Sequence, residues 1–219
     1  MNVDDRTYRA LRRAQILTGV VPVGLFLISH FAVNGRAIAG REAYAHTVAA
    51  IGRLPWLTAI EWVCIALPLL AHLALGVVLG LTRQGAYARP RPSARVRVAQ
   101  RVTGFYLAMY VVIHVWAIRL APERLAGKGE LFDLMAAQLR DPIVFGLQAL
   151  AVLAAGTHFA LGLVAMPDCF GWSPAAPTRP WWSTRFVRAS FVASAALVVL
   201  GLNALLAFVW TPAQWLAAR

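Results

Sequence analysis

Residues Ile143–Met166, with the sequence IVFGLQALAVLAAGTHFALGLVAM, run for 24 residues without a charged side chain. The hydrocarbon core of a bilayer is about 30 Å thick and a helix rises about 1.5 Å per residue, so roughly 20 apolar residues cross it. Four further charge-free runs can also cross it, alone or with flanking residues: Ile16–Val33, Trp62–Leu81, Val102–Ile118 and Ala189–Trp210. The sequence therefore predicts an all-α integral membrane bundle of five helices.

Helix start and stop signals place these five helices at approximately 14–34, 56–82, 101–121, 142–166 and 187–211. Asp141-Pro142 is a start signal for the fourth helix, because Pro is favoured in a first turn, and Pro167 is expected to end it. No cleavage pattern follows the first apolar run, so the first helix is expected to remain in the protein. Residues 1–219 are expected to form a single transmembrane domain.

The composition excludes a water-soluble globule, with 60% hydrophobic and 14% charged residues and a mean hydropathy of +0.64. The formal charge of +12 is spread between apolar runs instead of forming one patch, which argues against nucleic acid as a partner. The N-terminus and the segments Arg83–Arg101 and Asp168–Arg188 hold 13 of the 21 Lys and Arg residues. The five-helix topology puts these segments on one side, so the N-terminus is expected in the cytoplasm and the C-terminus outside.

The two cysteines are expected to be free thiols. Cys64 lies inside an apolar run and Cys169 in a later loop, at different predicted depths in the bilayer. Neither belongs to a Cys-x-x-Cys pair, which argues against an iron–sulfur cluster or a zinc site on this chain. Any such centre is expected in a partner.

Four of the five histidines fall inside the first four predicted helices, one in each: His30, His72, His114 and His158. Polar side chains inside a membrane are costly and tend to mark function. For any single histidine, the alternative is an ordinary neutral imidazole hydrogen-bonded between helices. Four in succession point to a function.

The predicted depths sort these histidines into two pairs. His30 and His114 lie six and five residues before the next charge at the outer side. His72 and His158 lie eleven and ten residues before the next charge at the inner side. Two matched pairs on separate helices indicate two sets of metal ligands.

Two imidazoles at one level, with no Asp, Glu or Cys near them, fit a haem with two axial histidines and do not fit tetrahedral zinc. An iron whose two axial positions are both filled by histidines transfers electrons and does not activate oxygen. His72 and His158 are each followed one turn later by a glycine, Gly76 and Gly162, where a missing side chain would let a flat macrocycle approach the helix. The alternative is that small residues are common wherever membrane helices meet.

A family resemblance follows from three strings in the sequence. They are RRAQILTGVVPVGLFLISH at residues 12–30, RVTG at 101–104 ahead of HVW at 114–116, and HFALGL at 158–163. The chain resembles the five-helix, dihaem cytochrome b subunit of succinate dehydrogenases and fumarate reductases, the form found with menaquinone-using bacteria. The four histidines, spaced by 42, 42 and 44 residues, carry most of this resemblance.

The resemblance implies that His72 and His158 bind the iron of an inner haem b, and His30 and His114 that of an outer one. It also points to Gln15 as a partner of the haem propionates, although Ile16 follows where the family usually has a hydroxyl residue. Carboxylates at a membrane edge need cations or indole N–H donors, and interfacial anchoring is the alternative role for such residues. The further candidates of this kind are Arg13, Arg97, Arg101 and Trp116.

A quinone site near the outer haem is also implied, with menaquinone as the family's substrate. Glu61, at the outer end of the second helix, is a candidate proton donor or acceptor. Its alternative role is that of an interfacial acid stabilised by the helix dipole. His46, in the outer loop, is interpreted as a surface residue.

The implied partners are a flavoprotein subunit carrying FAD and an iron–sulfur subunit, both on the cytoplasmic face. This chain contains no Gly-rich dinucleotide loop, so flavin chemistry is expected in those subunits. The implied location is the bacterial inner membrane, which the chain crosses several times. Succinate oxidation and fumarate reduction both remain open as the physiological direction.

Two alternatives remain from the residues alone. One is the b-haem subunit of another respiratory oxidoreductase. The other is a small transporter that uses buried histidines as a proton relay, which would predict inverted repeats and broken helices. Neither feature is visible in the sequence.

Overall fold

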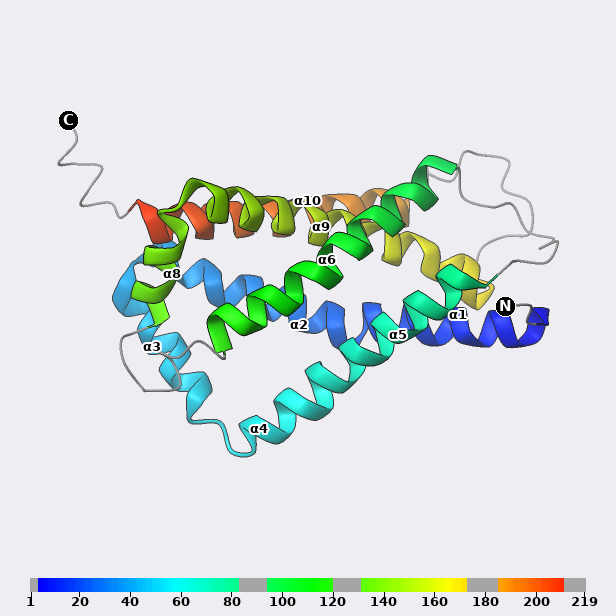
Figure 1. Ribbon diagram of the computed structural model, residues 1–219, viewed down its shortest axis with the longest axis horizontal. Coiled ribbons are helices and arrows are strands. Elements are labelled where there is room, and N and C mark those ends of the chain that lie inside the picture. The colour runs from blue at the N-terminus through cyan, green and yellow to red at the C-terminus, as the bar shows by residue number, and fades with distance from the viewer. Residues whose placement is uncertain (1–3, 83–93, 120–130, 173–184, 211–219) are drawn as a thin grey trace. The chain divides into compact units, whose positions relative to one another are not determined.

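The computed structural model describes residues 4–82, 94–119, 131–172 and 185–210 (Figure 1). Throughout these ranges the regular structure is helical, without a strand. The elements are α1 (Asp5–Val20), α2 (Pro22–Gly35), a short 3-10 turn (Arg36–Ala39), α3 (Arg41–Gly52), α4 (Leu57–Ile60), a π-helical turn (Glu61–Ala66), α5 (Leu67–Leu81), α6 (Ala94–Arg119), α8 (Leu131–Leu139), α9 (Pro142–Phe170) and α10 (Arg185–Val209).

Within the described residues, five helical stretches are long and apolar enough to cross a membrane: Asp5–Ala39, Leu57–Leu81, Arg95–Arg119, Pro142–Pro167 and Arg185–Val209. Each overlaps one of the predicted helices. Large apolar side chains on them are open to the surroundings, for example Phe105 at 72% and Ile143 at 73%. In water such surfaces would be costly, whereas lipid covers them. The predicted fold class is confirmed.

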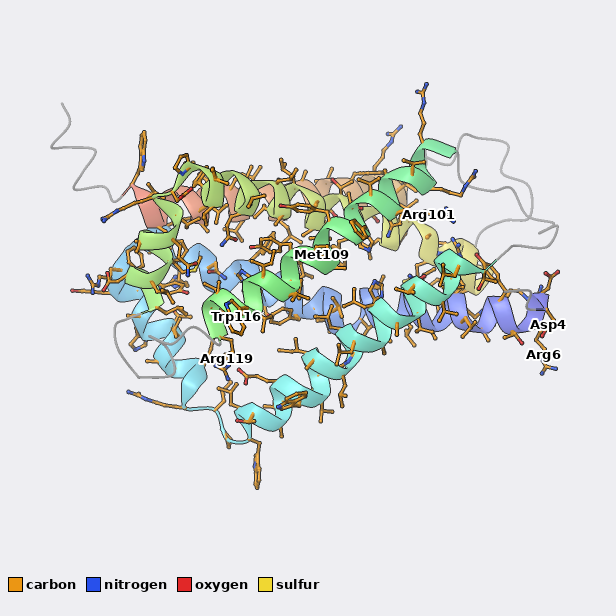
Figure 2. All side chains as sticks on the ribbon, in the orientation of Figure 1. Asp4, Arg6, Arg101, Met109, Trp116 and Arg119 are labelled. Carbon is orange, nitrogen blue, oxygen red and sulfur yellow. The ribbon has the colours of Figure 1, made fainter. Side chains whose placement is uncertain are left out.

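The first helix begins earlier than the predicted start at residue 14. The Asp4 carboxylate accepts hydrogen bonds of 2.9 Å from the backbone N–H groups of Arg6 and Thr7, and the Thr7 hydroxyl donates to it at 2.8 Å. These bonds satisfy the free N–H groups of the first turn and lower the pKa of Asp4. The cap extends α1 through a polar segment that hydropathy alone does not predict (Figure 2).

Pro22 interrupts the first span for a single residue. The helix is broken at Val21, because Pro22 has no backbone N–H to donate. Val21 still donates to the Leu17 carbonyl at 3.0 Å, and Leu25 donates to the Val21 carbonyl at 3.0 Å. The interruption is therefore local, and the hydrogen-bond ladder resumes at once.

The second span contains a π-helical turn at Glu61–Ala66, directly before Pro68. Leu67 donates its N–H to the Trp62 carbonyl, five residues back, which is the π-helical pattern. Since Pro68 cannot donate to the usual carbonyl, a local change of hydrogen bonding next to it is expected. Glu61 thus opens a widened turn.

The start of α9 follows the sequence signal. The Asp141 carboxylate accepts from the backbone N–H groups of Ile143 and Val144 at 2.8 and 3.2 Å, and Pro142 is the first helical residue. An Asp cap with Pro behind it satisfies or removes the donors of the first turn.

The expected end of this helix at Pro167 is wrong. The helix continues to Phe170 and stops at Gly171, which has a φ of 78°. Trp172 donates its N–H to the Pro167 carbonyl at 2.8 Å, the hydrogen bond of a Schellman terminus. The left-handed glycine ends the helix, because that conformation is accessible to Gly and a single proline can be accommodated inside the helix.

The chain divides into two compact units. The first comprises Met1–Leu27, Thr58–Val102 and Thr157–Ser194, and the second comprises Ile28–Leu57, Thr103–Gly156 and Ala195–Arg219. One domain over residues 1–219 stays a prediction.

In the first unit α1 lies along α5, as Figure 1 shows. The buried residues of the first unit include Ile16, Leu79 and Ala160, and two serines of α10, Ser190 and Ser194. The thiols of Cys64 and Cys169 do not form a disulfide, as predicted.

The second unit contains α3 and α8, which are joined by an ion pair and by aromatic packing. Arg41 donates to the Asp133 carboxylate at 2.5 Å. The rings of Tyr44, Phe132 and Phe208 have centroids 5.0 to 5.9 Å apart. This cluster holds α3 and α8 against the C-terminal end of α10.

Candidate functional site

The four intrahelical histidines are divided equally between the units. The first unit holds His72 on α5 and His158 on α9, and the second holds His30 on α2 and His114 on α6. All four imidazoles are partly buried. Each unit therefore has one pair of histidines from two different helices.

In the first unit the rings of His72 and His158 are neighbours in an edge-to-face arrangement. Their centroids are 6.1 Å apart and their planes are 89° apart. The Nδ1 atom of His72 is 2.9 Å from the Gln15 carbonyl oxygen. An N–H at Nδ1 donates to this carbonyl, which fixes the tautomer and leaves the Nε2 lone pair for a ligand.

Gly19 provides the space for the His72 ring. A Cβ at position 19 would lie 2.5 Å from Cε1 and 2.7 Å from Nδ1 of His72. These distances are shorter than real Cβ contacts, so any side chain would force the ring to move. Sequence reasoning missed this residue, because nothing local indicates which helix face meets α5.

The other ring of this pair has an amide beside it. Gln100 of α6 places its Nε2 atom 3.3 Å from Nε2 of His158 and 3.4 Å from the His158 carbonyl oxygen. A metal at His158 Nε2 would displace this amide. Gln100 was also missed, since it lies in the polar start of α6 and has no histidine near it in the sequence.

In the second unit His30 and His114 form an equivalent pair. Their centroids are 5.9 Å apart and their planes are 88° apart. Asn34 donates to the His30 carbonyl at 2.8 Å, and its amide nitrogen is 3.4 Å from His30 Nε2. Each pair thus combines one imidazole that faces an amide with one whose Nδ1 has an oxygen partner.

For His114 that oxygen belongs to Tyr110. The Tyr110 hydroxyl is 3.2 Å from His114 Nδ1 and donates a close hydrogen bond to Oε1 of Gln148 on α9. Asn34 and Tyr110 each stand four residues from a histidine, a helical spacing that could have identified them. Gln148 is a buried polar residue inside the apolar run, and it too could have been suspected.

The spacing of both pairs fits a single metal ion held between two imidazoles. An imidazole nitrogen binds a first-row metal at about 2 Å and lies about 1 Å from its ring centroid, so two opposed rings have centroids about 6 Å apart. The observed 6.1 and 5.9 Å match. Among the described residues no group of three or more His, Cys, Asp or Glu gathers, and a metal held by either pair would need further ligands, which a porphyrin supplies.

The two predicted haem-packing glycines lie in the first unit. A Cβ at Gly76 would be 3.1 Å from the Gln15 side-chain nitrogen, and one at Gly162 would be 3.9 Å from a Val20 methyl group. The Gln15 side chain therefore lies against Gly76, while its backbone carbonyl holds His72. Contact of either glycine with a haem stays a prediction.

The predicted propionate partners are divided between the units. Arg13 donates its Nε–H to the Cys169 carbonyl at 3.1 Å and lies over the Phe170 ring, so it ties α1 to the end of α9. Arg97 and Arg101 lie near the start of α6, and Trp116 lies near its end (Figure 2). The two arginines share a unit with His72, and Trp116 shares one with His114. Their roles toward propionates stay predictions.

Glu61 is half-buried at the start of the π-helical turn. Turns of this kind are frequent at functional sites. His46, on α3, is exposed, in keeping with its interpretation as a surface residue.

Comparisons with known proteins give one informative match. No family model matches the chain, and no solved structure matches it. The chain is 36% identical over 201 residues to the succinate dehydrogenase cytochrome b558 subunit of Bacillus subtilis (strain 168). The match covers 90% of this chain and 96% of the relative. With its apolar helices and paired histidines, the chain thus belongs to the family of succinate dehydrogenase cytochrome b subunits.

Proposed function

We propose that this chain is the membrane anchor and electron-transfer subunit of a succinate:quinone oxidoreductase or quinol:fumarate reductase, with two haem b groups. The observation that carries the proposal is the presence of two histidine pairs, each with the ring spacing of one axially ligated iron, in a chain of this family. Haem b, when bound, supplies a one-electron carrier with both axial positions filled.

The residues around the pairs support this role by orienting the ligands. His72 is held by the Gln15 carbonyl and His114 by the Tyr110 hydroxyl, so each presents Nε2. His158 and His30 complete the two ligand sets.

In the proposed complex the N-terminus lies in the cytoplasm and the C-terminus outside the inner membrane of a bacterium. A flavoprotein subunit with FAD and an iron–sulfur subunit dock on the cytoplasmic face and exchange electrons with the His72–His158 haem. Menaquinone reacts near the His30–His114 haem. The proposal holds for succinate oxidation and for fumarate reduction.

The ring planes predict the electron paramagnetic resonance (EPR) spectrum of the oxidised complex. The ring planes are 89° apart in one pair and 88° apart in the other, and imidazoles that bound one iron at such an angle would leave two iron d orbitals nearly equal in energy. We expect two strongly anisotropic low-spin ferric signals with large low-field g values, alongside two haems per chain by pyridine haemochrome assay. A purified complex without haem would refute the proposed function, and rhombic signals typical of parallel planes would refute the ligand geometry.

Glu61 is proposed to exchange protons with the quinone. In Glu61→Gln we expect quinone-linked activity to fall by about 100-fold or more, because general acid–base catalysis contributes that much. Succinate oxidation with a soluble acceptor, which bypasses the membrane subunit, should be unchanged, as should the haem content. Glu42→Gln, an exposed acid in the first turn of α3, is the matched control. Full quinone activity in Glu61→Gln would rule out this role.

A further inference from the structure

The Tyr110 side chain lies between the His114 ligand and the buried amide of Gln148. Its ring stacks on the His114 ring, with centroids 5.3 Å apart and planes 22° apart. Its hydroxyl is within 3.2 Å of His114 Nδ1 and in close contact with Oε1 of Gln148, whose side chain is 8% exposed. All three residues belong to the second unit.

The chemistry of the hydroxyl sets the direction of these hydrogen bonds. A phenol has one proton, and here it is donated to Gln148 Oε1. The Tyr110 oxygen can then only accept from His114, so His114 carries its proton on Nδ1. Nε2 is left as the ligand atom. The amide of Gln148 thus determines, through Tyr110, which nitrogen of His114 is available.

Resting on the proposed function, we propose that Tyr110 is a positioning residue that sets the reduction potential of the haem held by His30 and His114. An imidazole whose Nδ1–H donates to an oxygen is a stronger electron donor at Nε2. Stronger donation stabilises ferric iron and lowers the potential. The stacked ring also fixes the plane of His114, and with it the 88° angle to His30.

The first unit has no equivalent of this arrangement at His72. There the acceptor is the backbone carbonyl of Gln15, which no side-chain substitution removes. The two haems therefore differ in how their ligand basicity is controlled. At His114 the acceptor is the side chain of Tyr110, so the potential of the His30–His114 haem should respond to a substitution at position 110.

The test is an optical redox titration of the purified complex carrying Tyr110→Phe, which keeps the stacked ring and removes the oxygen. We expect both haems to be retained, the potential of one haem to rise, and the other to stay unchanged. The responsive haem should be the one lost in His114→Ala. Its EPR signal should keep a large low-field g value, because the stacked ring that fixes the plane of His114 is retained.

Tyr106→Phe is the matched control. Tyr106 stands one turn earlier on α6, stacks on Tyr110 with centroids 6.2 Å apart, and donates to the Leu147 carbonyl at 2.7 Å. Its substitution removes the same atom without touching His114, so both potentials should stay unchanged. Gln148→Leu is a second variant, in which the Tyr110 proton loses its acceptor and the potential of the same haem should rise.

Unchanged potentials in Tyr110→Phe and Gln148→Leu complexes that keep both haems would overturn this inference and leave the proposed function standing. A wild-type complex without haem would overturn both. An equal shift in Tyr106→Phe would also overturn the inference, because the effect would then not depend on the contact with His114.

Discussion

Replacing His72 or His158 by alanine is expected to remove the same haem, and replacing His30 or His114 is expected to remove the other. In the proposed function each pair supplies both axial ligands of one iron, so losing either ligand would leave an iron held from one side only. The measurement is a reduced-minus-oxidised spectrum of each purified variant, with haem quantified per chain. Electron transfer from succinate to quinone should be abolished in all four.

His46→Ala is the control for this series, because His46 is the fifth histidine and is exposed on α3. It should retain both haems. A result in which His72→Ala and His114→Ala remove the same haem would contradict the pairing. Retention of both haems in all four variants would exclude these histidines as ligands.

Gly19→Ala is expected to disrupt the haem of the first unit while leaving that of the second unit intact. The added methyl group would lie 2.5 Å from His72 Cε1, so the ring must leave its place opposite His158. Misplacing a ligand or its support typically lowers metal affinity by about 10- to 100-fold. Haem content and the separate potentials of the two haems measure this effect.

Gly80, which lies on α5, provides the control. A Cβ at Gly80 meets nothing within 4 Å, so Gly80→Ala adds the same methyl group in open space. Alanine is also the better helix former, which means that the Gly19→Ala change does not itself weaken α1. Gly19→Ala with both haems bound and both potentials unchanged would show that the ring tolerates the added methyl group.

Gly19 and Tyr110 together illustrate how this scaffold differs at its two histidine pairs. At His72 the ligand is confined by a missing side chain and a backbone carbonyl. At His114 it is held by a stacked phenol and a buried amide. Gly19→Ala is therefore expected to displace the His72 ring, whereas Tyr110→Phe is expected to weaken electron donation by His114.

The five spans and the succession of one histidine per helix could be predicted from local patterns in the sequence. Lipid demands about 20 apolar residues per crossing and a helix that satisfies its own backbone, so charge-free runs such as Ile143–Met166 can be recognised without any tertiary information. The cap at Asp141-Pro142 is equally local, because its hydrogen bonds join residues two and three apart. The sorting of the four histidines into two pairs also follows from the sequence, because it uses the predicted depth of each histidine along its helix.

The surroundings of each imidazole could not be predicted in this way, because they depend on how the helices pack. Gly19 meets His72 across 53 positions of sequence, and Gln100 meets His158 across 58, contacts that depend on which faces of two helices come together. The end of α9 was misjudged at Pro167, because a left-handed glycine and an arginine from α1 stabilise the terminus beyond it. The apolar runs and their flanking charges predict how deep a residue lies in the membrane. The rotation of each helix about its axis is set by packing against its neighbours.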